Sequence, residues 1–421
     1  MAKYLVQKSG PLMGEVVISG AKNAVLPLMA AALLAEEKCI ISDVPALKDV
    51  AVLTELLATL GSKVEQRDNN ILEIETPKIT NNEAEYELVK KMRASILVMG
   101  PLLARTGRAK MPSPGGCTIG ERPIDLHLKG FEALGATIVL KDSYVEAISP
   151  EGGLIGSSVY LDFPSVGATE NIMMAAVLAK GTTYIENAAE EPEIVDLANF
   201  LNKMGARIRG AGMDTIKIEG VARLSGSEHT VIPDRIETGT FMLAAAITRG
   251  ELLIRNVVPD HVKPIIAKLR ECGVTVEILD EGVLVRANEK ELVATDIKTL
   301  PYPGFPTDIQ SPFMTFLTTV NGVSTVVETV FENRFMHVAE LNRMGANIKT
   351  EGRSAVVQGG KNLEGAQVIA TDLRAGAALV LAGLVAEGTT EISEIYHVER
   401  GYEKFVEKFR QIGATIIRLE E

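Results

Sequence analysis

The chain has 421 residues, 46% of them hydrophobic and 23% charged, a composition typical of a soluble globular protein with two domains. Its formal net charge of −12 and its 5% aromatic content exclude an extended basic surface or an aromatic platform for nucleic acids. An anionic ligand must therefore be held by a few individually placed cations.

The chain opens with a predicted strand, turn and strand over 6–22, followed by a helix over 22–35. This helix is apolar nearly all round, which predicts burial on every side. Five later segments share the pattern, so we expect six buried helices. The other five span 93–104, 169–179, 237–248, 307–318 and 373–386.

A glycine that ends an amphipathic helix follows the start of each buried helix by 36 to 42 residues. The first, Gly61, stands in LATLGSKVE, where a helix C-cap favours a left-handed residue and a β-rich run comes next. The following intervals are 74, 70, 68, 72 and 68 residues, which lead to Gly135, Gly205, Gly273, Gly345 and Gly413. This regularity predicts six repeated units of buried helix, strand, outer helix and further strands, with helices inside and sheets outside.

The sixth unit stops just after its first strand, and the segment 6–22 resembles the strand, turn and strand of 356–374. We therefore expect the N-terminal arm to complete unit six. Three units then make up each domain, the first over 22–232 and the second over 233–421 together with 1–21. Two chain crossings between the domains suggest a two-stranded hinge.

Charged and polar residues recur at the starts of the buried helices. Six helix N-termini that point at one cleft would collect anions. Ordinary capping is the alternative, and it suits Asp308 and Thr238, whereas cations such as Lys22 and Arg93 oppose the helix dipole. The residues at or just before these starts are Lys22 with Asn23, Arg93, Glu170, 234–238, Asp308 and Arg374.

A second position lies 13 residues before each glycine, at the expected start of the outer helix. For Arg122 or Arg400 alone, a solvated surface arginine is the more common outcome. As equivalent residues of the two domains, they could together make bidentate contacts to a phosphate or carboxylate. The six residues at this position are Lys48, Arg122, Pro192, Asp260, Glu332 and Arg400.

The segment 110–123, KMPSPGGCTIGERP, contains three prolines and three glycines, which predict an exposed and mobile loop. It carries Cys117, one of three widely spaced cysteines that fit a reducing cytoplasm and not a disulfide framework. We expect Cys39 and Cys272 to be core residues, since both align with apolar positions of the repeat. An unpaired thiol in a loop suggests instead a chemical role for Cys117.

Several common sites are missing from the sequence. The five histidines form no HExxH pair and no CxxC occurs, so we expect no metal. No GxxxxGK[ST] loop is present, and GAGMDT at 210–215 falls in a strand turn, so neither a nucleoside triphosphate nor a nicotinamide cofactor is supported. The longest apolar runs, 24–35 and 375–386, have 12 residues, and the first residues lack the apolar stretch of a signal peptide. We expect a cytoplasmic protein without a membrane role.

Longer motifs run through the whole chain: GAKNAVLPL at 20–28, PGGCTIGERPIDLHL at 114–128, PSVGATEN at 164–171, PDRIETGTF at 233–241, FPTDIQ at 305–310, ETVFENRF at 328–335, TDLRAGAALV at 371–380 and HVERGYEKF at 397–405. Together they strongly resemble the UDP-N-acetylglucosamine 1-carboxyvinyltransferases, a family of enolpyruvyl transferases. The resemblance implies an α/β fold of two inside-out barrel domains, each of three repeated units with buried parallel helices surrounded by sheets. It also implies cofactor-free transfer of the enolpyruvyl group of phosphoenolpyruvate to the 3-hydroxyl of UDP-N-acetylglucosamine with release of phosphate, the first committed step toward the peptidoglycan precursor.

The same resemblance implies the site residues. Those for phosphoenolpyruvate are Lys22, Asn23, Arg122 and Arg400, with Asp372 and Arg374 nearby. Those for UDP-N-acetylglucosamine are Arg93, Arg122, Pro123, Ile124, Asp125, Leu126, Ser165, Val166, Gly167, Asp308 and Val330. The catalytic set is Cys117, Asp308, Lys22 and Arg400, in which Asp308 would accept the proton of the attacking hydroxyl.

Protonation of the methylene carbon of phosphoenolpyruvate generates an oxocarbenium-like centre that the sugar hydroxyl attacks. Cys117 could supply that proton, or its thiolate, favoured by nearby cations, could capture the centre covalently. The resemblance also implies that fosfomycin alkylates Cys117. His127 could touch a substrate phosphate or could equally be a satisfied structural histidine.

Three other functions stay open. A shikimate-phosphate enolpyruvyl transferase shares the fold and the donor but not the cysteine loop. A non-catalytic repeat scaffold could bind a nucleotide sugar. An RNA-end-processing enzyme of similar repeat architecture is disfavoured by the acidic charge.

Overall fold

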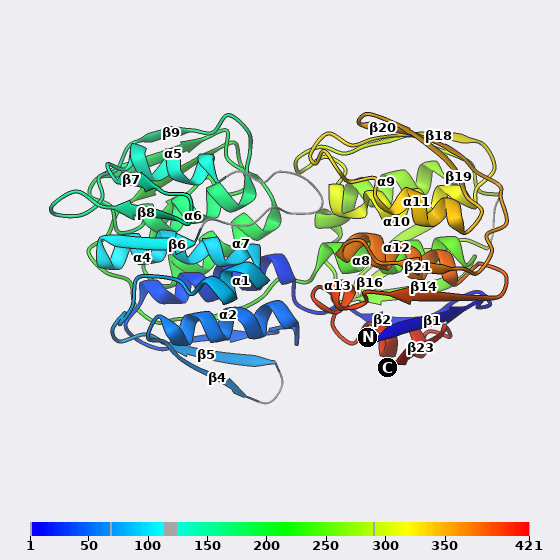
Figure 1. Cartoon of the computed structure of the whole chain (residues 1–421), viewed down its shortest axis with the longest axis horizontal. Coiled ribbons are helices and arrows are strands. Elements are labelled where there is room, and N and C mark those ends of the chain that lie inside the picture. Colours follow the sequence, from blue (N-terminus) through cyan, green and yellow to red (C-terminus); the bar gives the residue numbers. More distant parts are fainter. Residues whose placement is uncertain (1, 68–69, 113–123, 289–290, 421) are drawn as a thin grey trace. The chain divides into compact units, whose positions relative to one another are not determined.

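The structure is a computed structural model that describes residues 2–67, 70–112, 124–288 and 291–420. The described chain divides into two compact units, each a mixture of helices and strands (Figure 1). The terminal unit comprises the residues up to Ser19 and those from Pro233 onward. The middle unit comprises the described residues from Gly20 to Ile232.

Six helices form the interior of the two units, as their apolar patterns predict. In α12, for example, every residue from 374 to 383 is buried. In the terminal unit α8, α10 and α12 lie side by side (Figure 1). The six are α1 (Lys22–Ala31), α4 (Met99–Thr106), α6 (Val166–Ala176), α8 (Arg235–Ile247), α10 (Gln310–Thr318) and α12 (Leu373–Gly383), and the short 3₁₀ helices η1 (Ala32–Leu34), η2 (Arg93–Val98) and η4 (Thr307–Ile309) adjoin them.

Each outer helix ends at the expected glycine, and the six glycines have φ between +90° and +109°. After α2, the N–H of Gly61 donates to the carbonyl of Ala58 at 3.1 Å, and the N–H of Ser62 donates to that of Leu57 at 3.0 Å. The same two bonds close the other five helices, so the predicted helix ends are confirmed as a backbone geometry that glycine adopts without a Cβ clash. The outer helices are α2 (Lys48–Thr59), α5 (Asp125–Ala133), α7 (Pro192–Lys203), α9 (Lys263–Glu271), α11 (His337–Arg343) and α14 (Phe405–Gln411), and the shorter α3 (Tyr86–Lys91), α13 (Tyr396–Glu399) and η3 (Pro259–Val262) lie between them.

Some of the predicted helix starts are wrong. Helix α11 begins five residues after Glu332, and α14 begins five residues after Arg400, which is instead the C-cap of α13. Helix α6 begins four residues before Glu170. The glycine predicts where a helix ends, because the C-cap is a local structure. A fixed distance before the glycine does not predict where the helix begins, because the number of turns differs between the helices.

Six sheets surround the helices in the part of the chain that the structure describes. Their strand orders are β13-β3-β5-β4, β6-β8-β7 and β11-β12-β10-β9 in the middle unit, and β15-β16-β14-β2, β17-β18-β20-β19 and β21-β22-β1-β23 in the terminal unit. The strands are β1 (Lys3–Gln7), β2 (Met13–Val17), β3 (Cys39–Ser42), β4 (Lys63–Arg67), β5 (Ile71–Glu75), β6 (Arg108–Pro112), β7 (Thr137–Leu140), β8 (Tyr144–Ile148), β9 (Ser158–Tyr160), β10 (Thr182–Glu186), β11 (Arg207–Arg209), β12 (Thr215–Glu219), β13 (Glu228–Thr230), β14 (Glu251–Arg255), β15 (Thr275–Leu279), β16 (Gly282–Arg286), β17 (Ile297–Lys298), β18 (Val323–Val327), β19 (Asn347–Glu351), β20 (Ser354–Gln358), β21 (Gln367–Ile369), β22 (Thr389–Ser393) and β23 (Thr415–Leu419).

The N-terminal arm lies in two sheets of the terminal unit. Strand β1 runs antiparallel to both β22 and β23, with Val6 opposite Thr390 on one side and Ile416 on the other. Strand β2 runs parallel to β14. Val6 is fully buried, so the arm also contributes to the core.

Two of the three cysteines are in the cores, as the repeat predicts. Cys39 and Cys272 are fully buried, and burial raises the pKa of their thiols to about 11 and about 12. No helix in the described ranges is both long and apolar enough to cross a membrane.

A buried polar network holds Ser19, the last residue of the terminal unit before the chain enters the middle unit. The Ser19 N–H donates to Glu237 Oε2 at 2.8 Å, and its hydroxyl donates to Glu403 at 2.6 Å. The Lys408 ammonium donates to Ser19 Oγ at 2.7 Å and to Glu237 Oε1 at 2.6 Å. Burial raises the pKa of Glu237 to about 7, although the charge of Lys408 lowers it.

We expect Lys408→Met to destabilise the protein by about 3 kcal/mol, because it leaves a buried carboxylate without its cation. In the wild type, the raised pKa of Glu237 costs stability as the pH rises from about 4.3 to about 7. In the variant the pKa of Glu237 is higher still, so the variant continues to lose stability above pH 7. The destabilisation relative to the wild type is therefore larger at pH 8 than at pH 6. Urea unfolding at both pH values measures this.

The control is Lys268→Met, which removes an ammonium group from a half-exposed pair with Glu271 at 2.6 Å. It should cost less than about 1 kcal/mol at either pH. Equal losses for the two variants, or a Lys408→Met loss independent of pH, would contradict the assigned network.

Candidate active site

The residues predicted for the site fall into two groups, one in each unit. Cys117, Arg122 and Pro123 lie outside the described residues. The middle unit contains Lys22, Asn23, Arg93, Ile124, Asp125, Leu126, Ser165, Val166 and Gly167, and the terminal unit contains Asp308, Val330, Asp372, Arg374 and Arg400.

Lys22 is the first residue of α1, where a cation opposes the helix dipole. Its ammonium lies 2.9 Å from Asp49 Oδ2, in the first turn of α2, and the Asp49 side chain is only 3% exposed. Asn23, the next residue, is exposed. Asp49 therefore anchors Lys22 beside the accessible amide of Asn23. The sequence analysis did not identify Asp49, although it directly follows Lys48.

Arg93 begins η2 and is partly exposed. Its charge acts on His127, whose pKa is lowered to about 4, first by burial and then by Arg93. His127 is therefore neutral at pH 7.

The hydrogen bonds of His127 determine its tautomer. Asn171 Oδ1 accepts from the N–H of Gly100 at 2.6 Å, so its Nδ2 faces His127 Nδ1 at 3.0 Å and can only donate. His127 Nε2 then carries the proton. A Cβ added at Gly167 would lie 3.3 Å from His127 Cε1, so His127 packs directly against the first turn of α6. The contacts favour the structural interpretation of His127.

Helix α6 presents an N-terminus suited to an anion. Ser165 is its N-cap, with Oγ accepting from the N–H of Ala168 at 3.3 Å, and Val166 and Gly167 form the start of the first turn. All three predicted residues are partly exposed. Free backbone N–H groups and the positive end of the dipole attract negative charge at such a position. Helix α5 of the same unit has Ile124 as N-cap and has Asp125 and Leu126 in its first turn.

In the terminal unit, Asp308 pairs with two buried arginines. Its Oδ1 accepts from Arg334 Nη2 at 2.9 Å, and its Oδ2 accepts from Arg374 Nε at 3.1 Å and Nη2 at 3.0 Å. The side chains of Arg334 and Arg374 are 3% and 2% exposed. Burial is the largest single effect and lowers the pKa of Arg374, but Asp308, Tyr402 and Asp234 together raise it more, so the net shift is upward. The sequence analysis did not single out Arg334 as a partner of Asp308, although it lies within the motif ETVFENRF at 328–335.

The Nη1 atoms of both arginines are buried without a hydrogen-bond partner in the described structure. Such donors are costly unless something accepts from them. The three groups carry a net charge of about +1, counting each as ionised at pH 7. The arrangement therefore suits an additional anionic acceptor.

Helix α12 is capped by Asp372, whose Oδ1 accepts from the N–H groups of Arg374 at 2.8 Å and Ala375 at 3.0 Å. Ordinary capping, the alternative considered for Asp308, is not found, since η4 begins after Pro306 and has no side-chain cap. Thr238 lies inside α8, which Asp234 caps.

Arg400 is partly exposed at the C-terminal end of α13, where a cation is favourable to the helix dipole. The pKa of His397 is lowered, first by burial and then by the charge of Arg400. Val330 lies in the turn after β18.

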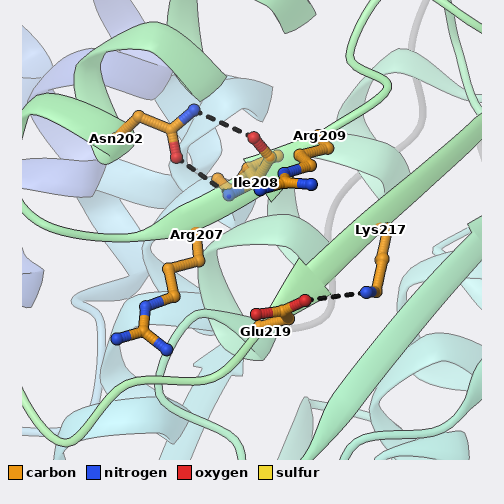
Figure 2. A pocket seen from close by; sticks show the side chains of 6 residues that line it. All are labelled: Asn202, Arg207, Ile208, Arg209, Lys217 and Glu219. Atoms are coloured by element: carbon orange, nitrogen blue, oxygen red, sulfur yellow. Dashed lines mark hydrogen bonds and ion pairs between the residues drawn. The ribbon is translucent and has the colours of Figure 1, made fainter.

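Two surface cavities contain none of the predicted site residues. The first, of 240 Å³, lies over β11 and β12 (Figure 2). There Asn202 binds both polar backbone groups of Ile208, and Lys217 pairs with Glu219 at 2.7 Å. The second, of 540 Å³, lies between α9 and β18. In the described ranges no cluster of three or more His, Cys, Asp or Glu could hold a metal ion.

The sequence matches the family model for EPSP synthase (3-phosphoshikimate 1-carboxyvinyltransferase) over residues 6–409. The UDP-N-acetylglucosamine 1-carboxyvinyltransferase 1 of Caldanaerobacter subterraneus subsp. tengcongensis is 63% identical, and the alignment covers 99% of both chains. UDP-N-acetylglucosamine 1-carboxyvinyltransferase 2 of Carboxydothermus hydrogenoformans is 61% identical and covers 100% of both. UDP-N-acetylglucosamine 1-carboxyvinyltransferase 1 of Staphylococcus aureus N315 is 56% identical over 100% of both.

Solved structures share the fold at lower identity. The enolpyruvyl transferase NikO from Streptomyces tendae has a TM-score of 0.90 and 24% identity, covering 99% of this chain and 98% of its own. An EPSP synthase from Acinetobacter baumannii has a TM-score of 0.79 and 16% identity, covering 100% of both. These similarities confirm the predicted fold class.

We expect Arg374→Met to destabilise the protein by about 3 kcal/mol, because it removes one of the two buried arginines that pair with the Asp308 carboxylate. The control Arg343→Met removes an arginine that is 59% exposed and 3.4 Å from Glu340, and it should cost less than about 1 kcal/mol. Urea unfolding compares the two variants. Equal losses of unfolding free energy would show that the group of Asp308, Arg334 and Arg374 contributes no more than a surface ion pair.

Proposed function

The chain belongs to the UDP-N-acetylglucosamine 1-carboxyvinyltransferases of the enolpyruvyl transferase family, and we infer from this that it transfers the enolpyruvyl group of phosphoenolpyruvate to the 3-hydroxyl of UDP-N-acetylglucosamine. The observation that carries this conclusion is 61 to 63% identity to relatives of that name over nearly the whole of both chains. The reaction releases phosphate and belongs to peptidoglycan precursor synthesis.

The chemistry is an addition followed by an elimination. The methylene carbon of phosphoenolpyruvate gains a proton, and the sugar oxygen forms a bond to the neighbouring carbon. That carbon then loses phosphate while a proton leaves the methyl group. The protein must therefore hold an anionic donor, orient a hydroxyl and exchange protons at two positions.

For the donor, we propose Lys22, Asn23, Arg122 and Arg400, with Asp372 and Arg374 in support. Asp49 pairs with the Lys22 ammonium at 2.9 Å and so limits its motion, which places a positive charge for a phosphate or carboxylate beside the exposed Asn23. The unpartnered Nη1 of Arg374 is a further donor for negative charge.

For the sugar nucleotide, we propose that the N-terminus of α6 at Ser165, Val166 and Gly167 receives a phosphate, since its first turn is accessible and correctly capped. Arg93 and the start of α5 contribute further contacts from the same unit. The complete proposed set is Arg93, Arg122, Pro123, Ile124, Asp125, Leu126, Ser165, Val166, Gly167, Asp308 and Val330.

We propose that Asp308 accepts the proton of the attacking hydroxyl. Two guanidinium groups stabilise its ionised form, so it can accept a hydrogen bond from that hydroxyl. The same cations make it a weak base, and the proton should therefore transfer only as the carbon–oxygen bond forms.

We propose Cys117 as the acid that protonates the methylene carbon, with covalent capture of the same centre as a second possible step. This assignment rests on the family resemblance. We further propose that the enzyme works in a reducing cytoplasm, and that cell shape and division depend on it through the cell wall.

Purified protein should release phosphate from phosphoenolpyruvate when UDP-N-acetylglucosamine is the acceptor. Shikimate 3-phosphate is the control acceptor, because the matched family model is named for that reaction. A colorimetric phosphate assay with each acceptor distinguishes the two. Release with shikimate 3-phosphate alone would refute the proposed acceptor.

Fosfomycin should alkylate Cys117 and no other cysteine. Cys39 and Cys272 are fully buried thiols with raised pKa values, so they are both inaccessible and protonated. Mass spectrometry of intact and digested protein should show one adduct, absent from a Cys117→Ala variant. An adduct on Cys272 would contradict this assignment.

A further inference from the structure

We propose that Glu328 is a positioning residue that holds the Asp308 segment and the Val330 turn in place for the sugar nucleotide. This inference rests on the function proposed above. It concerns a residue that the resemblance does not assign to the site.

Glu328 directly follows β18 and is 1% exposed. Its Oε2 accepts from the hydroxyl of Thr307 at 2.9 Å, and Thr307 immediately precedes Asp308 in η4. Its Oε1 accepts from the backbone N–H groups of Val330 at 2.8 Å and Phe331 at 3.2 Å. One carboxylate thus joins the two segments that carry the proposed sugar-nucleotide residues of the terminal unit.

A third segment joins the same carboxylate. The hydroxyl of Thr299, just after β17, donates to Glu328 Oε1 at 2.8 Å and accepts from the N–H of Thr329 at 2.9 Å. The hydroxyl of Thr329 donates in turn to the Thr299 carbonyl at 2.6 Å. Four donors from three segments therefore converge on Glu328, and hydrogen bonds to an ionised acceptor are about twice as strong as neutral ones.

These bonds act on the main chain near the site. Arg334 and Arg374 orient the carboxylate of Asp308, whereas Glu328 restrains the residue before it. The bonds to Val330 and Phe331 likewise restrain backbone atoms. A displacement of about 1 Å in a substrate-positioning group can cost about 10²-fold in rate, so such restraint affects substrate use and not only stability.

The test compares two substitutions of Glu328. Glu328→Asp keeps the charge but shortens the side chain by one methylene, so its oxygens cannot reach both Thr307 and the Val330 turn. Glu328→Gln keeps the shape, and its amide donates where Oε2 accepted, so Thr307 must reverse its hydroxyl. We expect the KM for UDP-N-acetylglucosamine to rise roughly tenfold in Glu328→Asp and less in Glu328→Gln, with the KM for phosphoenolpyruvate changing less than about twofold.

The matched control is Glu340→Gln. Glu340 is also buried, at 8% exposed, and accepts from the backbone N–H of Ile369 at 3.2 Å. Glu340→Gln should lower the Tm without raising the KM for UDP-N-acetylglucosamine more than the KM for phosphoenolpyruvate. A second variant, Thr307→Val, removes one donor to Glu328 with little change in shape, and combined with Glu328→Asp it should raise the KM no further than Glu328→Asp alone.

The outcomes separate the two proposals. If the wild type releases phosphate with UDP-N-acetylglucosamine but the Glu328 variants change both KM values equally, or change only the Tm, the positioning role is refuted. If the wild type releases none, the proposed function fails and this role fails with it.

Discussion

The burial of six helices on all sides determines where polar chemistry can lie in this protein. A charged group in the middle of α8 or α12 would be surrounded by the apolar core and would cost several kcal/mol. The first turn of a helix is different, because its N–H groups still need acceptors and it lies at the edge of the core. Several residues proposed for the substrates stand at such first turns or beside them, as Lys22, Ser165 and Arg374 illustrate, whereas Arg400 and Val330 do not. A fold with helices inside thus gathers anion-binding groups at helix ends.

Cations at these ends need a second stabilising interaction, since they face the positive end of the dipole. Two of them pair with a carboxylate from elsewhere in the chain, Lys22 with Asp49 and Arg374 with Asp308. A buried pair of this kind contributes little net stability compared with apolar residues of the same size, whereas losing one partner is costly. These ion pairs therefore add little to the stability of the fold, but they make substitution of either partner costly.

The sequence predicted the features that depend on local geometry. The buried helices follow from apolar residues on every face, and the six helix ends follow from a glycine that can adopt positive φ, as at Gly61. It predicted the start of α14 at Arg400 wrongly, because no local signal sets the number of turns before the glycine. It also missed Asp49, Arg334 and Glu328. Their roles depend on partners brought together by the tertiary fold, and a polar residue in a turn looks the same whether or not it meets such a partner.

Asp308 combines two tasks that compete. As the counter-ion of Arg334 and Arg374, it must stay ionised, because protonation would remove the carboxylate charge that pairs with two buried guanidinium groups. As the proposed base, it must accept a proton. The two tasks become compatible when another anion reaches the arginines, and the Nη1 atom of each is buried without a partner in the described structure. A bound phosphate or carboxylate would accept from these atoms and replace the charge that Asp308 loses. With the proposed roles, proton acceptance by Asp308 would be linked to occupation of the anion site, so that the hydroxyl would be activated only when the donor is present.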